Sequence, residues 1–183
     1  STRRASAAGL AVACLLAGPG ALGAPFGVEG VRVESTQELA TAVEKALPKA
    51  DVLIMAAAPA DYRPKKASAT KTKRGAGSMS LDLEPTPDVL EATVAKRMKG
   101  AVIVGFALEA GEAVASAREK LAAKQLDLVV ANDATEPDAG PEAETNRVAL
   151  VANDGVERLP LMSKEAVAER IVDRVGVLLS GRG

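Results

Sequence analysis

The chain of 183 residues has no histidine, no tryptophan and only one cysteine, Cys14. The lack of histidine excludes Ser-His-Asp chemistry, histidine general bases and histidine-ligated metals. A single cysteine excludes disulfides within the chain and cysteine-cluster zinc sites, and it fits a reducing compartment. Aromatic residues make up 2% of the chain, which argues against a stacking platform for single-stranded nucleic acid. The core must therefore consist of alanine, valine and leucine.

The charges of the chain nearly cancel, because Lys and Arg total 23, Asp and Glu total 24, and the net charge is -1. A dedicated nucleic-acid binder needs a broad basic surface, so we expect no nucleic-acid partner, and any cationic function must be local. We expect no membrane partner either, because a transmembrane helix needs about 20 consecutive apolar residues. The length and the 48% hydrophobic content predict a single α/β domain over residues 1–183.

Residues 1–28 form an atypical start that allows two interpretations. Arg3 and Arg4 precede an apolar run at 10–17, and small residues follow at 21–24, which is the pattern of a secretory signal. The same run is compatible with a buried strand that follows the end of a helix and precedes a Gly-Pro turn. We favour the strand, because the rest of the chain is typical of a cytoplasmic protein. An exported binding protein is the alternative.

Strand and helix patterns alternate along the rest of the chain. Continuous apolar runs at 51–58, 101–108 and 127–131 are typical of parallel strands that are buried on both faces. Apolar residues recur at helical spacing in four segments: 35–47, 86–98, 112–125 and 163–178. Ser35 and Glu38 have the spacing of a capping box, and Thr86 has the position of an N-cap.

The end of the chain carries a hairpin signal, Asn-Asp-Gly at 153–155, between apolar segments at 145–152 and 156–161. The alternation predicts a three-layer, Rossmann-like α/β fold. Its mostly parallel sheet has helices on both faces and ends in a C-terminal antiparallel hairpin. Ligands in such sheets bind at the carboxyl ends of the strands. The segments that follow the three apolar runs are therefore the candidates for function.

The first candidate is residues 59–79, a flexible basic flap without an apolar period. Asp61, near its start, can accept hydrogen bonds from a sugar or a base. A cationic cluster suits a polyphosphate, although a solvated surface loop is an equally good interpretation of the pattern. The cluster consists of Lys65, Lys66, Lys71, Lys73 and Arg74.

The other candidates lie near later strand ends. Phe106 can stack on a nucleobase, although the pattern alone favours a core aromatic. Lys120 and Lys124 lie one helical turn apart and can hold phosphate or form a solvated helix face. Asn132 and Asp133 at a strand end, and Asn146 at the start of an outer strand, can bind a ligand or turn the chain. The sequence has neither a P-loop nor the usual dinucleotide fingerprint, which disfavours an NAD-linked oxidoreductase.

These segments, taken in order, resemble phosphopantothenoylcysteine synthetase from about residue 30 to the end. Residues 56–64 read AAAPADYRP, 71–74 read KTKR and 86–90 read TPDVL. Residues 104–109 read VGFALE, and 120–133 read KLAAKQLDLVVAND. Asn146 matches the asparagine that ends the loop after the last motif. Each motif is weak by itself, and the five in order are specific.

The resemblance implies a ligase of coenzyme A biosynthesis that depends on CTP, accompanied by Mg²⁺. CTP activates the carboxylate of 4'-phosphopantothenate as an acyl-cytidylate, and the amine of cysteine then displaces CMP. By the same resemblance, Lys71 and Ala58 are the catalytic positions, with Lys71 neutralising phosphate charge and Ala58 lining the acyl pocket. The implied nucleotide-binding residues are Asp61, Lys71, Phe106, Lys120 and Lys124, and the possible substrate-binding residues are Asn132 and Asn146. No protein metal ligand is implied.

The resemblance also implies partners. In the family the active site lies at a dimer interface, where the flap of one subunit covers the site of its neighbour, so a homodimer is expected. In bacteria the synthetase is usually the second half of a bifunctional protein, which makes a phosphopantothenoylcysteine decarboxylase domain a possible partner. The expected location is the cytoplasm.

The sequence departs from the family pattern at its start. Family members begin with a strand and a Gly-rich nucleotide loop, followed by a segment with a catalytic asparagine, and residues 1–30 show neither. We therefore expect this chain by itself to be a poor synthetase or inactive. The alternative function is a catalytically impaired remnant of the fold that keeps nucleotide binding or dimerisation.

Overall fold

The computed structural model describes residues 13–20, 23–66, 70, 77–135 and 143–182. The chain divides into two compact units. The first unit comprises residues 1–43 and 59–89, and the second comprises residues 44–58 and 90–183. Within the described residues, no helix has both the length and the apolar character that a membrane crossing requires.

The second unit is built on a five-stranded mixed sheet with the strand order β10-β9-β7-β6-β3. Strands β3, β6 and β7 run parallel, and β9 and β10 add an antiparallel hairpin at one side. This confirms the predicted α/β class, the predominance of parallel strands in the predicted core runs and the C-terminal hairpin. The strands are β3 (Val52–Met55), β6 (Val102–Glu109), β7 (Leu128–Asp133), β9 (Val148–Ala152) and β10 (Gly155–Arg158).

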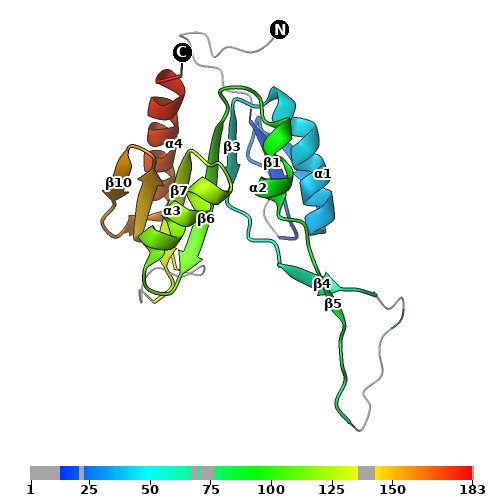
Figure 1. Ribbon diagram of the computed structural model, residues 1–183. Coiled ribbons are helices and arrows are strands. Elements are labelled where there is room, and N and C mark those ends of the chain that lie inside the picture. Colours follow the sequence, from blue (N-terminus) through cyan, green and yellow to red (C-terminus); the bar gives the residue numbers. More distant parts are fainter. Residues whose placement is uncertain (1–12, 21–22, 67–69, 71–76, 136–142, 183) are drawn as a thin grey trace. The chain divides into compact units, whose positions relative to one another are not determined.

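Two helices cover opposite faces of this sheet (Figure 1). Alternate side chains of β6, β7 and β9 form a core with one face of α4 (Lys164–Ser180), where Val167, Ile171 and Val175 are buried. The intervening side chains face α3 (Ala113–Ala123), in which Ala117 and Leu121 are buried. The helix–sheet–helix layering follows from the period of two along each strand.

The predicted start of the last helix is confirmed in detail. The Ser163 hydroxyl accepts a hydrogen bond of 3.2 Å from the Ala166 amide, so Ser163 is the N-cap of α4. Ser163 also belongs to β11 (Met162–Ser163), which pairs antiparallel with β8 (Thr145–Asn146). The last helix is therefore anchored directly to the segment that leads into the sheet.

The apolar runs at 101–108 and 127–131 are buried strands, as predicted, whereas the run at 51–58 is not. The strand β3 covers only residues 52–55 and is the outermost strand of the five-stranded sheet in the described part of the chain. Its Ile54 side chain is 43% exposed. An apolar run reports the hydrophobicity of a strand but not how many neighbouring strands it has, so the prediction of burial on both faces was wrong.

The first unit contains a two-stranded parallel sheet and one long helix. Strand β1 (Cys14–Ala17) pairs with β2 (Glu29–Arg32), which confirms a strand in the described part of the 10–17 run. Residues 10–12 lie outside the described residues. Cys14 and Leu15 are exposed, so the expectation that this strand is buried was wrong. The apolar run forms a strand, but its two-stranded sheet covers little of it.

The first helix, α1 (Thr36–Ala46), begins at the predicted capping box. The Glu38 amide donates a hydrogen bond of 3.2 Å to the Ser35 hydroxyl, and the Glu38 carboxylate accepts one of 2.9 Å from the Glu34 amide. A 3-10 turn, η1 (Leu47–Lys49), follows the helix, and Leu47 is buried. The helical period predicted over 35–47 is therefore confirmed.

The helix predicted over 86–98 is the largest error in the secondary structure. Strands β4 (Tyr62–Pro64) and β5 (Leu83–Pro85) form an antiparallel pair, and Thr86 continues it. The Thr86 amide donates to the Asp61 carbonyl at 2.8 Å, and its hydroxyl donates to the Ala60 carbonyl at 2.5 Å. The helix itself begins only at Val89, three residues after Thr86. Only a four-residue helix, α2 (Val89–Ala92), and a 3-10 turn, η2 (Val94–Lys96), remain of the predicted helix.

Candidate functional site

The carboxyl ends of the parallel strands meet at one edge of the five-stranded sheet, as the sequence predicted. Along this edge Leu108 of β6 lies beside Asn132 of β7, and Asn132 lies beside Val148 of β9. The last residue of β3, Met55, pairs with Gly105 of β6. Ala58 follows this strand end by three residues, and the Ala58 side chain is exposed. The edge therefore gathers the segments that the sequence singled out after each strand.

Lys120 and Phe106 meet at this edge, although 14 residues separate them. The Lys120 ammonium on α3 donates a hydrogen bond of 2.5 Å to the Phe106 carbonyl. The contact holds a cation against the backbone of β6, just beyond the residues of β6 that pair with β3. A charged donor on a carbonyl is a strong contact, so it fixes the position of the ammonium group. Lys120 is therefore placed to meet an anion at the strand ends.

The ring of Phe106 has a second role. It is half-buried and packs against the core cluster beneath α4. This agrees with the pattern-based interpretation of Phe106 as a core aromatic. The ring is nevertheless only partly covered, because it stands near the carboxyl end of β6, where the sheet meets solvent. Stacking on a base stays a prediction.

Lys124 ends α3 one turn beyond Lys120. Its amide donates to the Lys120 carbonyl at 3.0 Å, and its side chain is half-buried. Because α3 runs back from the carboxyl edge, Lys124 stands about 6 Å further from that edge than Lys120 does. A flexible lysine side chain can span such a distance. The two lysines share one flank of α3, with Lys120 nearer to the strand ends.

Asn132 and Asn146 occupy different settings at the same edge. Asn132 is half-buried within β7. The Asn146 side chain accepts a hydrogen bond of 2.9 Å from the Arg147 amide, which is the turn chemistry that the sequence offered as the alternative to ligand binding. The single side-chain oxygen of Asn146 therefore already accepts one hydrogen bond.

Asp133, which the sequence offered beside Asn132 as a ligand-binding or turn residue, organises the loop at the end of β7. Its Oδ1 atom accepts hydrogen bonds from the Thr135 hydroxyl at 2.6 Å, the Thr135 amide at 2.8 Å and the Gly111 amide at 3.2 Å. These donors, with the Thr135 hydroxyl foremost, hold the pKa of the Asp133 carboxyl below its usual value. The spacing Asp-x-Thr is a turn signal that the sequence does contain.

The remaining predicted site residues lie in or near the basic flap. Asp61 is exposed and belongs to the first unit, where its carbonyl accepts from the Thr86 amide. Lys65 and Lys66 are exposed. Lys71, Lys73 and Arg74 lie outside the described residues. The roles of these residues stay predictions.

Residues 2–178 match the family described as the DNA/pantothenate metabolism flavoprotein C-terminal domain. The chain belongs to this family. The match spans nearly the whole chain, and it confirms the resemblance that the five motifs indicated.

Two curated relatives and one solved structure show the same relationship. The coenzyme A biosynthesis bifunctional protein CoaBC of Bacillus subtilis (strain 168) is 39% identical over 171 residues, covering 92% of this chain and 42% of the relative. The protein of the same name from Mycobacterium tuberculosis (strain ATCC 25618 / H37Rv) is 44% identical over 168 residues, which cover 86% of this chain and 40% of the relative.

The solved structure is described as the C-terminal domain of CoaBC. It superposes with a TM-score of 0.75 at 33% identity, covering 92% of this chain and 74% of that chain. The chain thus spans about two fifths of the length of the curated relatives. The region of CoaBC that it resembles is the C-terminal one.

Proposed function

We propose that this chain is a phosphopantothenate–cysteine ligase of coenzyme A biosynthesis that uses CTP. The observation that carries the proposal is the contact between the Lys120 ammonium and the Phe106 carbonyl. It joins two of the family motifs at the edge where open α/β sheets bind their ligands. Membership of a family whose relatives are named for coenzyme A biosynthesis supports the same activity.

The reaction requires two displacements. In the first, a carboxylate oxygen of 4'-phosphopantothenate attacks the α-phosphorus of CTP, an acyl-cytidylate forms and pyrophosphate leaves. In the second, the amine of cysteine attacks the acyl carbon, the bond from that carbon to the CMP oxygen breaks, and the amine loses a proton. Both steps build negative charge on phosphate oxygens, and positioned cations stabilise such charge.

Each predicted residue has a part in this chemistry. Lys120 meets the triphosphate at the strand ends, Lys124 extends the cationic flank, and Lys71 neutralises charge on the phosphates and on the activated intermediate. Ala58 leaves room for the acyl group, because its side chain is a single methyl. The remaining contacts are proposed for Asp61 and Phe106 with the nucleotide and for Asn132 and Asn146 with the substrates.

Magnesium enters this proposal with the nucleotide. Within the described residues, no group of three or more Cys, His, Asp or Glu side chains could hold a metal ion. Mg²⁺ usually keeps several waters and binds substrate phosphates, so phosphate oxygens and water supply most of its ligands here. Its contribution is to neutralise phosphate charge. A homodimer, a decarboxylase domain as partner and a cytoplasmic location belong to the same proposal.

Nucleotide binding tests the proposal directly. Calorimetry on the 183-residue chain compares CTP, ATP and NAD for the unaltered chain, Lys120→Gln and a control, Lys99→Gln. Lys99 is exposed and lies before the amino end of β6, away from the proposed site. We expect CTP to bind preferentially and Lys120→Gln to weaken it about tenfold or more, the loss expected for a charge-assisted contact. Equal affinity for the two variants would contradict the site.

Turnover separates the ligase from its alternative. Pyrophosphate release with CTP, phosphopantothenate and cysteine is measured for the unaltered chain and Lys71→Ala. The ligase predicts release that needs all three substrates and falls strongly in Lys71→Ala. CTP binding without release would support the catalytically impaired nucleotide-binding remnant. Absence of CTP binding would overturn both.

A further inference from the structure

A cavity of about 550 Å³ lies on the α3 side of the five-stranded sheet, within the second unit. Its walls are the first turns of α3, the end of β7 at Asp133, the start of β9 and the end of β10. It thus lies over the hairpin side of the sheet. The lining includes Gly111, Glu112, Arg118, Arg147, Arg158 and Leu159.

This cavity lies on the opposite flank of α3 from the proposed nucleotide residues. Arg118 lines the cavity, whereas Lys120 reaches the Phe106 carbonyl on β6. Residues two positions apart on a helix point about 200° away from each other, so the two side chains leave α3 on different sides. The proposed CTP site and this cavity are therefore separate places on the unit.

Three guanidinium groups converge on the cavity from three elements. Arg158 lies opposite Ala149 in the β9–β10 hairpin, and Arg147 precedes Ala149 by two residues, so both share the α3 face. Arg118 comes from α3 itself. In the part of the chain that the structure describes, no hydrogen bond or ion pair engages the guanidinium groups of Arg118 and Arg158. Two such cations, Arg118 and Arg158, that line one cavity favour an anion between them.

Two carboxylates also line the cavity, Glu112 and Asp133. One Asp133 oxygen already accepts three hydrogen bonds, from Gly111 and Thr135, so part of its charge is offset. Glu112 precedes α3 and makes no side-chain capping bond. Three arginines against two acids leave a net positive charge. The amino end of α3, which also borders the cavity, adds the positive end of a helix dipole.

The remaining lining is apolar. Ala113, Val114, Ala115, Ala131 and Ala149 supply aliphatic surface between the charged groups. The volume falls in the range of sites for small molecules, which is about 300–1,000 Å³. A free inorganic ion would leave most of this surface uncovered. The lining suits a ligand with both an anionic and an apolar part.

We propose that this cavity binds a small phosphomonoester that carries an apolar group. A dianionic phosphate matches several forked guanidinium groups, each of which can donate two parallel hydrogen bonds. The apolar part covers the aliphatic side chains of α3, β7 and β9. The site does not depend on the ligase activity, because it shares none of the residues proposed for CTP.

The test uses phenyl phosphate as the probe, with inorganic phosphate and phenol as partial probes. Calorimetry on the 183-residue chain is expected to show the tightest binding for phenyl phosphate, weaker binding for phosphate and none for phenol. In Arg118→Gln/Arg158→Gln, the affinity for phenyl phosphate should fall at least tenfold, while the affinity for CTP should stay within twofold. Lack of phenyl phosphate binding at millimolar concentrations would overturn the proposal.

A matched control removes the same charge elsewhere. Arg32→Gln/Arg63→Gln also loses two arginines, and both lie in the first unit, outside the cavity. It should bind phenyl phosphate as the unaltered chain does. An equal loss in both double variants would mean that only overall charge matters and would refute the site. Should the cavity variant misfold, Arg118→Gln alone, on an exposed helix flank, must still lower the affinity several-fold.

Discussion

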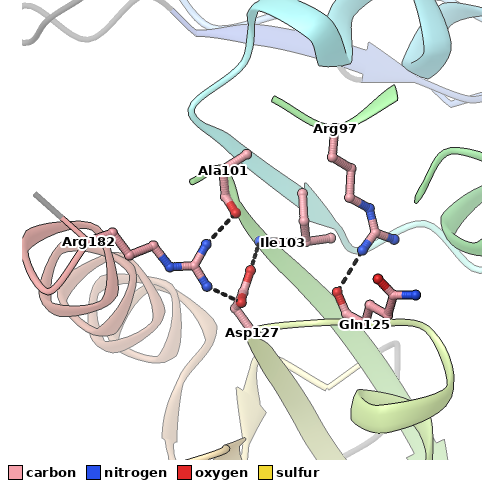
Figure 2. Close-up of polar contacts among 6 residues, drawn as sticks. All are labelled: Arg97, Ala101, Ile103, Gln125, Asp127 and Arg182. Carbon is pink, nitrogen blue, oxygen red and sulfur yellow. Dashed lines mark hydrogen bonds and ion pairs between the residues drawn. The ribbon is translucent and has the colours of Figure 1, made fainter. Parts of the chain in front are cut away.

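The carboxylate of Asp127 forms an ion pair with the guanidinium of Arg182, a residue 55 positions later in the chain (Figure 2). The second carboxylate oxygen accepts a hydrogen bond of 2.7 Å from the Ile103 amide. Arg182 also donates to the Ala101 carbonyl at 2.5 Å. These contacts join the amino ends of β6 and β7 to the end of α4. Asp127 belongs to one of the family motifs, and its role here is to hold the sheet together.

A second arginine binds backbone carbonyls at the same end of the sheet. Arg97 donates to the Gln125 carbonyl at 2.6 Å and to the Leu90 carbonyl at 2.7 Å (Figure 2 shows the first contact). Burial lowers the pKa of Arg97, and the negative charge of Asp127 acts in the opposite direction. The guanidinium groups of Arg97 and Arg182 thus stabilise the edge of the sheet opposite the candidate site.

The first prediction concerns Asp127→Ala. The substitution leaves the Ile103 amide and the Arg182 guanidinium without their partner, so the free energy of unfolding should fall by about 1–3 kcal/mol. Urea denaturation followed by circular dichroism measures it. Asp173→Ala, at an exposed position of α4, is the control and should change stability by less than about 0.5 kcal/mol. In an Asp127→Ala background, Arg182→Ala should cost less than it does alone, and full additivity would contradict the coupling.

The second prediction concerns Gly105, the glycine of the segment VGFALE. A Cβ atom at this position would lie 2.8 Å from Cδ1 of Leu126, a residue that is only 3% exposed. A buried leucine has little space to move, so Gly105→Ala should destabilise the protein by about 1–3 kcal/mol. Thermal and urea unfolding measure this change. In a Leu126→Ala background the penalty should shrink, because the obstructing atom is gone.

Gly176→Ala is the matched control for that substitution. No atom lies within 4 Å of a Cβ at Gly176, which is exposed on α4. Alanine has the higher helix propensity, so Gly176→Ala should raise stability by about 0.5–1 kcal/mol. If Gly105→Ala were also neutral or stabilising, the explanation of the motif glycine by close packing would be wrong.

The third prediction concerns the ionisation of Asp133. Its pKa lies below the usual value chiefly because the Thr135 hydroxyl donates to the carboxylate. A carboxyl with a lowered folded pKa contributes stability above its unfolded pKa of about 4, and that contribution disappears as the pH falls through the folded pKa. Thr135→Ala should therefore raise the pKa of Asp133 toward its usual value. A carboxyl-carbon NMR titration measures it.

The control for this titration is Thr41→Ala. The Thr41 hydroxyl donates to the Gln37 carbonyl within α1 and not to a carboxylate. This variant should leave the titration of Asp133 unchanged. An Asp133 pKa that is the same in Thr135→Ala and in the unaltered chain would show that the backbone donors alone account for the low value.

The fourth prediction concerns the start of α4. Ser163→Ala removes the acceptor for the Ala166 amide, and loss of a cap of this kind costs about 0.5–2 kcal/mol. Chemical denaturation should show a lower midpoint with an unchanged slope. Ser163→Asp restores an acceptor and places a negative charge at the positive end of the helix, so it should recover most of the loss. If Asp gave no recovery, the effect would not arise from capping.

Much of the fold could be predicted from local sequence. The buried strands β6 and β7 come from long apolar runs, and the β9–β10 hairpin follows from Asn-Asp-Gly. The capped helices α1 and α4 follow from a serine before an amphipathic period. Each signal acts over a few residues: turn geometry, a cap or a period. The motifs of the sequence also indicate the family, which the match over residues 2–178 confirms.

Tertiary structure decided the rest, for reasons that no local pattern contains. Thr86 has the sequence of a helix start, but its amide and hydroxyl donate to the Asp61 and Ala60 carbonyls, and the helix begins only at Val89. The run at 51–58 is apolar, but the number of strands beside it depends on the whole sheet.

The sequence by itself determined the residue types, their periods and therefore the order of strands and helices, because these depend on neighbours within one or two turns. The folded chain decided which distant groups meet: Lys120 with the Phe106 carbonyl, Asp127 with Arg182, and three arginines around one cavity. These contacts depend on the order in which the strands pair in the sheet and on which flank of a helix faces the strands. Function depends on these meetings, since charge acts over a few ångströms of space and not along the chain.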